Sequence, residues 1–356
     1  MTVLTGWGLT PKISTIVSES GAGEIPDVVK GSTTVTPRGL GRGYGDCAVS
    51  SRGLTLLTSR LDRIDEIAGD TVVVEAGVSL DRLLARIMPE GFFVPVTPGT
   101  RFVTIGGAIA ADIHGKKHHG DGSFGQHIEW LEILGANDRI IRATPHEHHE
   151  LFWATIGGMG LTGLMIRAAV KLLRIETSQI SVLTTRHENL DALMQAMMDR
   201  DTTHRYTVAW VDTLASGRSH GRSVLWAGDH ALRADLSHRA SRHPLRYEVG
   251  QRLRIPSAIP ISAVRASTVR VFNEVWFRRA HRRPTHSTES IAKFFHPLDG
   301  VGSWNHLYGP RGFVQYQFVV PDSHSELVGN FLQTLSTRRV PVFLSVLKRF
   351  GVRSQG

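Results

Sequence analysis

Glycine alternates with other residues across the ten-residue segment PRGLGRGYGD, residues 37–46. Successive backbone N–H groups of such a segment can turn toward one anion and form a concave nest around it. Arg38 and Arg42 add positive charge, and the strand-like residues 32–37 lead into it. The segment predicts a loop that holds a phosphate or pyrophosphate without a helix dipole. On spacing alone, an irregular turn explains the same glycines.

A second glycine pattern, G-x-G-x-x-G at residues 158–163, lies in the wrong context for a dinucleotide-binding Rossmann fold. That fold needs a strand before the glycines and a helix after them, so that the helix N-terminus meets the pyrophosphate. Here residues 146–158 have a helical pattern and residues 161–175 favour a strand. A tight turn with close backbone packing is therefore favoured. No G-x-x-x-x-G-K-[ST] motif of a P-loop NTPase is present.

The segment 98–125 is also rich in glycine and contains three histidines: His114, His118 and His119. Histidines at this spacing share a face only on a helix, and Gly115 disfavours a helix there. Only two acidic residues lie nearby to support metal-bound histidines. We therefore expect no metal site. A redox or substrate-contact role is favoured, with loop histidines of no special role as the alternative.

The hydrophobic periodicity predicts regular elements along the whole chain. We expect a strand at 70–78, a helix at 79–91 capped by Ser79, two strands within 127–144, a strand at 314–321, a helix at 325–339 and a strand at 340–351. After Glu176 the small, glycine-rich segments give way to polar segments rich in arginine and histidine. A domain boundary near residue 177 follows, with domains at 1–177 and 178–356.

The chain carries a formal charge of +9, from 41 Lys and Arg against 32 Asp and Glu, and its positive charge is densest at residues 230–283. Such a surface suits nucleic acid, anionic lipid or a phosphorylated substrate. Aromatic residues do not interleave with the charge as in RNA-binding modules, so nucleic acid is not an expected partner. A single cysteine excludes an intrachain disulfide. We identify no signal peptide and no apolar stretch long enough to span a membrane.

Seven segments together resemble a known flavoprotein family: LTGWG, RGLGRGYGD, VPVTPGTRFVTIGGAIAADIHGKKHH, ELFWATIGGMGLTG, FFHPLDGVGSWN, YGPRGFVQYQF and FLSVLKRFG. They resemble the vanillyl-alcohol-oxidase superfamily, which includes alditol and gulonolactone oxidases. Within it, they resemble the oxidases of decaprenylphosphoryl-ribose, the flavoprotein half of an epimerase. The resemblance runs the length of the chain, and IHGKKHH and GFVQYQF are its specific motifs.

The resemblance implies an α+β fold. Residues 1–177 would form a PCMH-type FAD-binding domain of two subdomains, and residues 178–356 a substrate domain with a large antiparallel sheet. Members of the family continue into a further segment with an active-site cysteine, an active-site lysine and a last flavin contact. We expect this chain to be truncated before that segment. An inactive remnant, or a fragment completed by another polypeptide, are the alternatives to an active enzyme.

The implied cofactor is FAD. Some relatives attach it to a histidine in the first glycine loop, where this chain has Arg42, so we expect non-covalent binding. The implied cofactor residues are Arg38, Gly39, Leu40, Gly41, Arg42, Gly43, Tyr44, Gly45, Asp46, Cys47, Gly99, Thr104, Ile105, Gly106, Gly107, Ala111, Asp112, Ile113, His114 and Met165.

The implied reaction converts the ribose 2-hydroxyl of a polyprenyl-phosphate sugar to a ketone. The resemblance implies His114 and Lys348 as catalytic residues. It places Tyr44, Lys116, Trp210, Phe295, Gln315, Gln317 and Val346 at the substrate. Gln315 and Gln317 would face one side of their strand. Phe295 stands where a tyrosine is common in the family.

The ketone would pass to an NADH-dependent short-chain reductase, which completes the epimerisation that supplies cell-wall arabinan. A lipid-linked substrate and the basic residues 230–283 imply peripheral membrane association, with a location in the cytoplasm or cell envelope at the inner membrane. A different sugar or alditol oxidase that uses oxygen is the alternative function.

Overall fold

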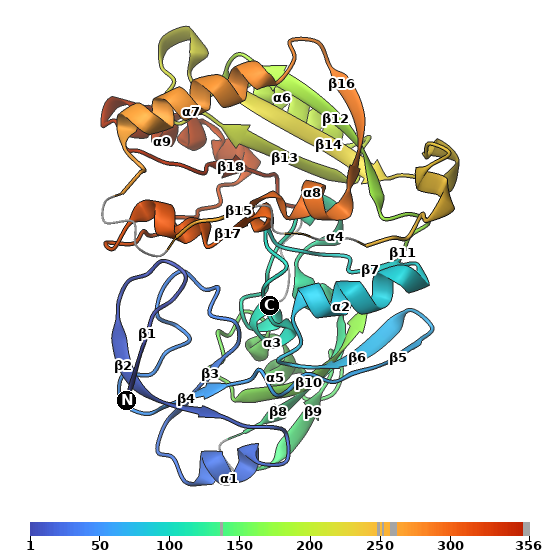
Figure 1. Cartoon of the computed structure of the whole chain (residues 1–356), viewed down its shortest axis with the longest axis vertical. Helices are drawn as coiled ribbons and strands as arrows, with labels where there is room; N and C mark the ends of the chain where they lie inside the picture. Colours follow the sequence, from blue (N-terminus) through green and yellow to red (C-terminus); the bar gives the residue numbers. More distant parts are fainter. Residues whose placement is uncertain (136–137, 248–249, 251–252, 257–261, 352–356) are drawn as a thin grey trace.

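The computed structural model describes residues 1–135, 138–247, 250, 253–256 and 262–351, and shows an α+β fold (Figure 1). The described residues form three larger sheets, and the first of them in sequence has the order β1-β2-β4-β3. Its strands are β1 (Thr2–Leu4), β2 (Ile13–Glu19), β3 (Val35–Arg38) and β4 (Leu54–Leu57), with α1 (Ile25–Lys30) after β2. β2 and β3 both run parallel to β4. The glycine-rich loop leaves the end of β3, as the strand-like lead-in predicted.

A second, antiparallel sheet has the order β5-β6-β10-β8-β9. Its strands are β5 (Ile64–Ala68), β6 (Thr71–Glu75), β8 (Ile128–Leu134), β9 (Ile140–Ala143) and β10 (Leu164–Lys171). Helices α2 (Leu80–Ile87), α3 (Ile105–Ala110) and α5 (His149–Thr155) belong to the same half of the chain. The predicted Ser79 cap is confirmed, because its hydroxyl accepts a hydrogen bond from the Arg82 amide at 3.2 Å. The two strands predicted within 127–144 are confirmed as β8 and β9, and the connection between them includes positions outside the described residues.

The G-x-G-x-x-G turn connects α5 to β10, so the prediction of a helix before it and a strand after it is confirmed. Gly160 and Gly163 adopt positive φ values of 81° and 140°, which side chains rarely allow. A Cβ on Gly163 would lie 2.6 Å from the Leu134 carbonyl oxygen. These glycines therefore serve a tight turn packed against β8.

A third, antiparallel sheet, with the order β16-β12-β14-β13-β18, forms the upper half of the molecule in Figure 1. Its strands are β12 (Gln179–His187), β13 (Tyr206–Val211), β14 (Ser223–His230), β16 (Thr285–Ser290) and β18 (Val346–Leu347). Ala209 and Val211 of β13 pack with α6 (Leu190–Asp201) and α9 (Glu326–Thr337). Trp210, on the opposite face of β13, packs with Phe277 of α7 (Ala266–Arg279).

Short elements lie between the upper and lower halves of the molecule (Figure 1). They are the antiparallel pair β7 (Phe92–Phe93) and β11 (Leu173–Arg174), the parallel pair β15 (Leu253–Arg254) and β17 (Val301–Gly302), α4 (His118–Asp121) and α8 (Ile291–Phe295). β11 precedes residue 177 and β12 follows it. The division into domains 1–177 and 178–356 stays a prediction.

Two strand predictions near the C-terminus were wrong. Residues 314–321 alternate apolar and polar side chains, yet in the part of the chain that the structure describes they belong to no strand of any sheet. Of residues 340–351, only Val346 and Leu347 form a strand, and they pair with Trp210 and Ala209. Alternation indicates which side chains share a side, but a strand also needs a neighbour for its backbone hydrogen bonds. The helix predicted at 325–339 is confirmed as α9.

Candidate active site

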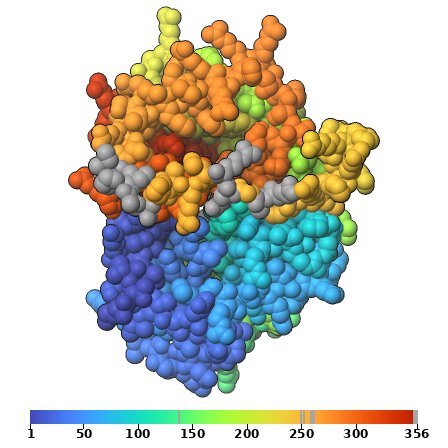
Figure 2. Space-filling model, in the orientation of Figure 1, coloured from blue at the N-terminus to red at the C-terminus, as the bar shows by residue number. Residues whose placement is uncertain are grey.

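A cavity of about 3110 Å³ lies between the glycine-rich segments of the first half and the third sheet. Pockets that bind one small ligand usually measure about 300–1,000 Å³. This cavity therefore has room for a large cofactor and a substrate together. Figure 2 shows the upper half hollowed between segments coloured orange, with red C-terminal residues inside the hollow.

The loop of residues 39–44 forms part of one wall and is held by backbone contacts from the N-terminus. The amide of Trp7 donates to the Gly43 carbonyl at 2.8 Å, and the amide of Gly8 donates to the Tyr44 carbonyl at 3.1 Å. Gly39 lies so close to Thr104 that a Cβ there would be 2.3 Å from the threonine hydroxyl oxygen. The backbone at Gly39 therefore lies too close to Thr104 for any residue with a side chain.

The same wall continues along α3, whose cavity side carries almost no side chain. Thr104 caps the helix by accepting a hydrogen bond from the Gly107 amide at 3.1 Å. Gly106 and Gly107 line the cavity, whereas Ile105 is fully buried in the core behind them. A Cβ on Gly106 would meet the Ala76 Cβ at 3.0 Å. A flat aromatic ring can therefore approach this wall closely.

A buried polar contact braces this wall from the second half of the chain. The Asp299 carboxylate accepts hydrogen bonds from the Thr100 hydroxyl at 2.6 Å and from the Arg101 amide at 2.8 Å. Thr97 bonds to the His296 ring at 2.8 Å, and that ring is fully buried. Burial raises the pKa of Asp299. The sequence analysis missed these residues because nearly 200 positions separate the partners, so no local spacing reveals them.

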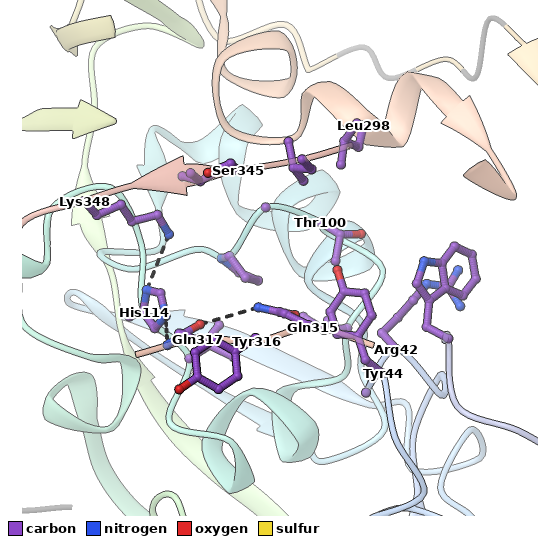
Figure 3. Close-up of a pocket in the computed structure, with 18 of the residues that line it drawn as sticks. Arg42, Tyr44, Thr100, His114, Leu298, Gln315, Tyr316, Gln317, Ser345 and Lys348 are labelled. Atoms are coloured by element: carbon purple, nitrogen blue, oxygen red, sulfur yellow. Dashed lines mark hydrogen bonds between the residues drawn. The ribbon is translucent and has the colours of Figure 1, made fainter. Parts of the chain in front are cut away.

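The opposite wall brings three predicted residues together (Figure 3). The His114 ring lies 3.0 Å from the Gln317 amide nitrogen through Nε2, and 3.4 Å from Lys348 Nζ through Nδ1. Burial, and then the charge of Lys348, lower the pKa of His114 to about 4. Burial lowers the pKa of Lys348 to about 8. At neutral pH His114 is therefore uncharged and able to accept a proton.

The neutral His114 ring has one donor and one acceptor nitrogen, which links it to the protonation of Lys348. With Lys348 charged, Nδ1 accepts from the ammonium and Nε2 carries the proton, so the Gln317 amide must present its oxygen. With Lys348 neutral, Nδ1 can donate to the lysine lone pair and Nε2 accepts from the Gln317 amide. The two arrangements present opposite ends of the Gln317 amide to His114 and differ by one proton.

Lys116 is a second lysine with an altered environment on this side. Its ammonium donates to the Phe294 carbonyl and lies 4.0 Å from the centre of the Phe294 ring. Burial and the charge of Lys348 lower the pKa of Lys116 to about 7. A substantial fraction of this amine is therefore neutral at pH 7. Lys116 and Lys348 can therefore exchange protons near neutral pH, whereas His114 stays uncharged there.

The remaining substrate residues implied by the resemblance also line the cavity: Tyr44, Trp210, Phe295, Gln315 and Val346. Tyr44 stacks edge to face on Phe313, with ring centres 5.3 Å apart. Gln315 lies 3.5 Å from Gln317, amide nitrogen to amide oxygen, so the two amides share one side although residues 314–321 form no strand. The contacts of these residues with a substrate stay predictions.

The implied cofactor residues line the cavity except for five: Arg38, Gly45, Asp46, Ile105 and Asp112. The Arg38 guanidinium donates to the Thr5 carbonyl at 2.7 Å and to the Ala48 carbonyl at 3.4 Å, so it holds the loop from behind. The Asp112 carboxylate accepts from the Gly125 amide at 2.8 Å. These side chains support the wall instead of forming its surface.

The wall fits a flavin dinucleotide. Arg42 lies over the Trp7 ring, 4.0 Å from its centre, and its burial lowers its pKa. The Arg42 guanidinium places a positive charge beside the glycine loop, where a pyrophosphate would neutralise that charge. A Cβ on Gly99 would meet nothing within 4 Å, so its backbone borders open space.

Other candidate sites carry less chemistry. Among the described residues, no three His, Cys, Asp or Glu side chains gather in a way that could hold a metal ion, and no helix is long and apolar enough to cross a membrane.

A G-x-S-x-G pattern at 217–221 escaped the sequence analysis. A nucleophile elbow needs a strand before the serine and a helix after it. Here a 3₁₀ turn (Gly217–Ser219) precedes β14, so that geometry is missing.

Comparison with known proteins agrees with this geometry. Residues 28–144 match the family model described as a FAD binding domain. The decaprenylphosphoryl-β-D-ribose oxidase of Mycolicibacterium smegmatis is 37% identical over 99% of this chain and 78% of its own length. An uncharacterised Streptomyces coelicolor protein is 34% identical over 78% of this chain and 77% of its own length. A putative D-arabinono-1,4-lactone oxidase of Neurospora crassa is 29% identical over 38% of this chain and 25% of its own length.

The match to the M. smegmatis protein covers the glycine wall and the wall of His114 and Lys348 together, because that protein aligns with nearly the whole chain. The chain is therefore a FAD-dependent oxidoreductase, and it belongs to the decaprenylphosphoryl-β-D-ribose oxidase family.

Proposed function

We propose that this protein oxidises the 2-hydroxyl of decaprenylphosphoryl-β-D-ribose to a ketone. The observation that carries the proposal is the neutral His114 between Gln317 and Lys348, in the cavity that the glycine wall also lines. The M. smegmatis relative bears the name of that substrate. FAD, when bound, supplies the acceptor for the two electrons that leave the sugar.

The glycine wall would hold the cofactor without a covalent bond. The loop of residues 39–44 and Arg42 would bind the pyrophosphate, since both offer donors to an anion. Gly106 and Gly107 would lie against the flavin ring, because both line the cavity without a side chain. Non-covalent binding rests on Arg42, because an arginine does not form the flavin link that a histidine forms in some relatives.

The other wall would bind the sugar and receive its proton. The amides of Gln315 and Gln317 suit hydrogen bonds to sugar hydroxyls. His114, uncharged at neutral pH, would take the hydroxyl proton as the C–H bond breaks. Lys348 would share that proton through Nδ1. Lys116 would attract the phosphate in its charged form.

Exposed apolar side chains beside the glutamines would accommodate the polyprenyl chain. Val314, Tyr316 and Phe318 are 83%, 74% and 38% exposed and line the same cavity. Such a lipid lies in a membrane, and each arginine or lysine near anionic lipid contributes about 1 kcal/mol to binding. We therefore propose peripheral association through the basic residues 230–283, part of which lies outside the described residues. Salt-insensitive or absent co-sedimentation with anionic vesicles would contradict it.

The ketone is an intermediate in this proposal. A reductase that uses NADH would return it to an alcohol of the opposite configuration, which makes the pair an epimerase for the arabinose of cell-wall arabinan. The site would then lie at the inner membrane, on the cytoplasmic or the envelope side.

Anaerobic mixing with decaprenylphosphoryl-ribose tests the proposal. We expect bleaching of the flavin absorbance and a ketone in the product by mass spectrometry. Arabinitol or a simple lactone that bleaches the flavin faster would favour a different sugar or alditol oxidase. Exposure of the reduced flavoprotein to air then separates the proposed function from a sugar or alditol oxidase that uses oxygen, because such an oxidase reoxidises its flavin quickly. Purified protein that binds no flavin would indicate an inactive member of the family.

A further inference from the structure

The segment that carries Lys348 is held weakly by the sheet itself. β18 has only two residues and pairs with β13 at the edge of the third sheet. Lys348 follows directly, so one short ladder fixes its backbone on the preceding side. Its position beside His114 therefore depends on the residues that come after it.

Arg349, the next residue, forms ion pairs with two carboxylates. Its guanidinium lies 3.0 Å from Asp201 and 2.8 Å from Asp322. The Asp201 side chain is only 6% exposed, whereas that of Asp322 is 78% exposed. Exposed ion pairs contribute little, because water and salt screen them and the side chains stay mobile. Asp201, at the end of α6, also accepts from the Thr207 hydroxyl and is the fixed anchor.

Phe350 and Gly351 then dock on α4, close to the loop of His114. The Phe350 ring stacks on His118 with centres 4.0 Å apart, and the Gly351 amide donates to His118 Nδ1 at 3.2 Å. A Cβ on Gly351 would lie 2.6 Å from the His119 carbonyl oxygen. Phe350 and Gly351 thus tie the segment to the element that follows His114 in sequence.

We infer that Asp201 is a positioning residue: through Arg349 it holds Lys348 against His114. The contacts form a closed circuit, because His119 Nδ1 of α4 also lies 3.7 Å from the Asp201 carboxylate. Lys348 and His114 are therefore fixed to the same anchor from two directions. The catalytic consequence rests on the proposed function, whereas the tether itself does not.

Lys348 forms no ion pair with the titratable groups that the structure places around it. They are His114, Lys116 and His118, each of which is either neutral or positively charged. A charged ammonium is thus more stable in water than in this cavity. Once the Asp201 anchor is lost, the segment can shift and Lys348 can turn its ammonium toward solvent.

Asp201→Asn in the FAD-loaded protein tests the inference, with Asp322→Asn as the matched control. Both variants remove one carboxylate from Arg349. Labelling of Lys348 with an amine-reactive reagent across a pH series, followed by mass spectrometry, measures the pKa of that lysine without any substrate. We expect a midpoint near 8 in the parent and in Asp322→Asn. In Asp201→Asn the midpoint rises by about one pH unit or more, toward the ordinary lysine value of about 10.4.

Turnover then adds a second readout. Misplacement of a catalytic group by about 1 Å can reduce the rate by about 100-fold. We expect flavin reduction by decaprenylphosphoryl-ribose to slow by about 10- to 100-fold in Asp201→Asn and to stay near the parent rate in Asp322→Asn. Equal midpoints in the two variants would overturn the inference. A parent protein that fails to oxidise the sugar contradicts only the proposed function, because the labelling result stands without it.

Thermal melting detects whether Asp201→Asn has lost its fold. In that case a second pair of variants, at Arg349, tests the inference. Arg349→Gln removes the ion pair with Asp201, and Arg349→Lys retains it. The midpoint of Lys348 should rise in Arg349→Gln and return toward the parent value in Arg349→Lys. An unchanged midpoint in Arg349→Gln would also overturn the inference.

Discussion

The two walls of the cavity use different parts of the chain. The glycine wall presents backbone, fixed by hydrogen bonds from the amides of Trp7 and Gly8 and braced by Asp299. The opposite wall presents side chains, and its central contact joins His114, Gln317 and Lys348 from segments about 200 residues apart. A backbone wall suits a large ligand that stays bound, and a side-chain wall suits proton transfer. Steric changes should therefore damage the first wall, and changes of protonation the second.

The largest expected effect is on the side-chain wall. His114→Ala removes the proposed base, and loss of general-base catalysis reduces rates by about 10²- to 10⁴-fold. Flavin content should stay at the parent level if the glycine wall alone holds the cofactor. Stopped-flow reduction with decaprenylphosphoryl-ribose measures the rate, with the exposed His146→Ala as control. A parent-like rate in His114→Ala would assign the base elsewhere.

Acid should destabilise the protein through histidines that the fold keeps uncharged. Burial lowers the pKa of His114 and of His230 to about 4, and that of His296 to about 3, from 6.5. Between these values and pH 6.5 the unfolded chain binds more protons, so the free energy of unfolding falls as pH falls through this window. Urea unfolding at pH 6.5 and pH 4 should show a loss of about 3 kcal/mol or more.

His230→Gln separates one contribution. This variant removes a titrating group and should flatten the pH dependence of stability, although it also weakens the 3.0 Å contact with the Tyr206 hydroxyl. The slope, not the absolute stability, is therefore the test. A slope equal to that of the parent would show that His230 does not contribute.

Gly39→Ala tests the glycine wall by sterics. Its Cβ would meet the buried Thr104 side chain at 2.3 Å, and overpacking of this kind costs about 1–3 kcal/mol. We expect reduced flavin content and a lower Tm. Gly45→Ala is the matched control in the same loop, because a Cβ there meets nothing within 4 Å. Equal flavin content in the two variants would contradict a closely packed wall.

Local patterns predicted much of the fold, and distant contacts limited the rest. The Ser79 cap, the turn before β10 and helix α9 depend on residues a few positions apart, and all three are confirmed. The strand predicted at 314–321 was wrong because its alternation contains no information about a neighbouring strand. Likewise, the structural roles of Asp299 and Asp201 depend on hydrogen-bond partners 198 and 148 residues away.

The residues of the candidate site also differ in how far local sequence patterns could predict them. Alternating glycines predicted a loop for a phosphate or pyrophosphate, with an irregular turn as the alternative, and only the family resemblance made FAD the expected ligand. The histidines of segment 98–125 suggested a redox or substrate-contact role for His114, whereas only the family resemblance singled out Gln317 and Lys348. Their mutual distances come from the fold of segments far apart in sequence.

The smallest expected effect concerns the charge beside the glycine loop. Arg42→Ala removes a cation–π contact with Trp7, worth about 0.5–2 kcal/mol, together with the charge expected at the pyrophosphate. Arg142→Ala removes a contact of the same geometry with Trp130, also 4.0 Å, at the second sheet. Both variants should lose similar stability, but only Arg42→Ala should bind flavin more weakly in a titration of the apoprotein. Similar flavin affinities would show that Arg42 plays no part in holding the cofactor.

One measurement tests the central claim that the two walls serve one reaction. The FAD-loaded protein is mixed anaerobically with decaprenylphosphoryl-β-D-ribose and with the same molecule carrying deuterium at C2, and flavin absorbance is followed in time. The account predicts bleaching, slower with the deuterated sugar, and slower still in His114→Ala. Flavin that stays oxidised with this sugar but is bleached by another would contradict the claim.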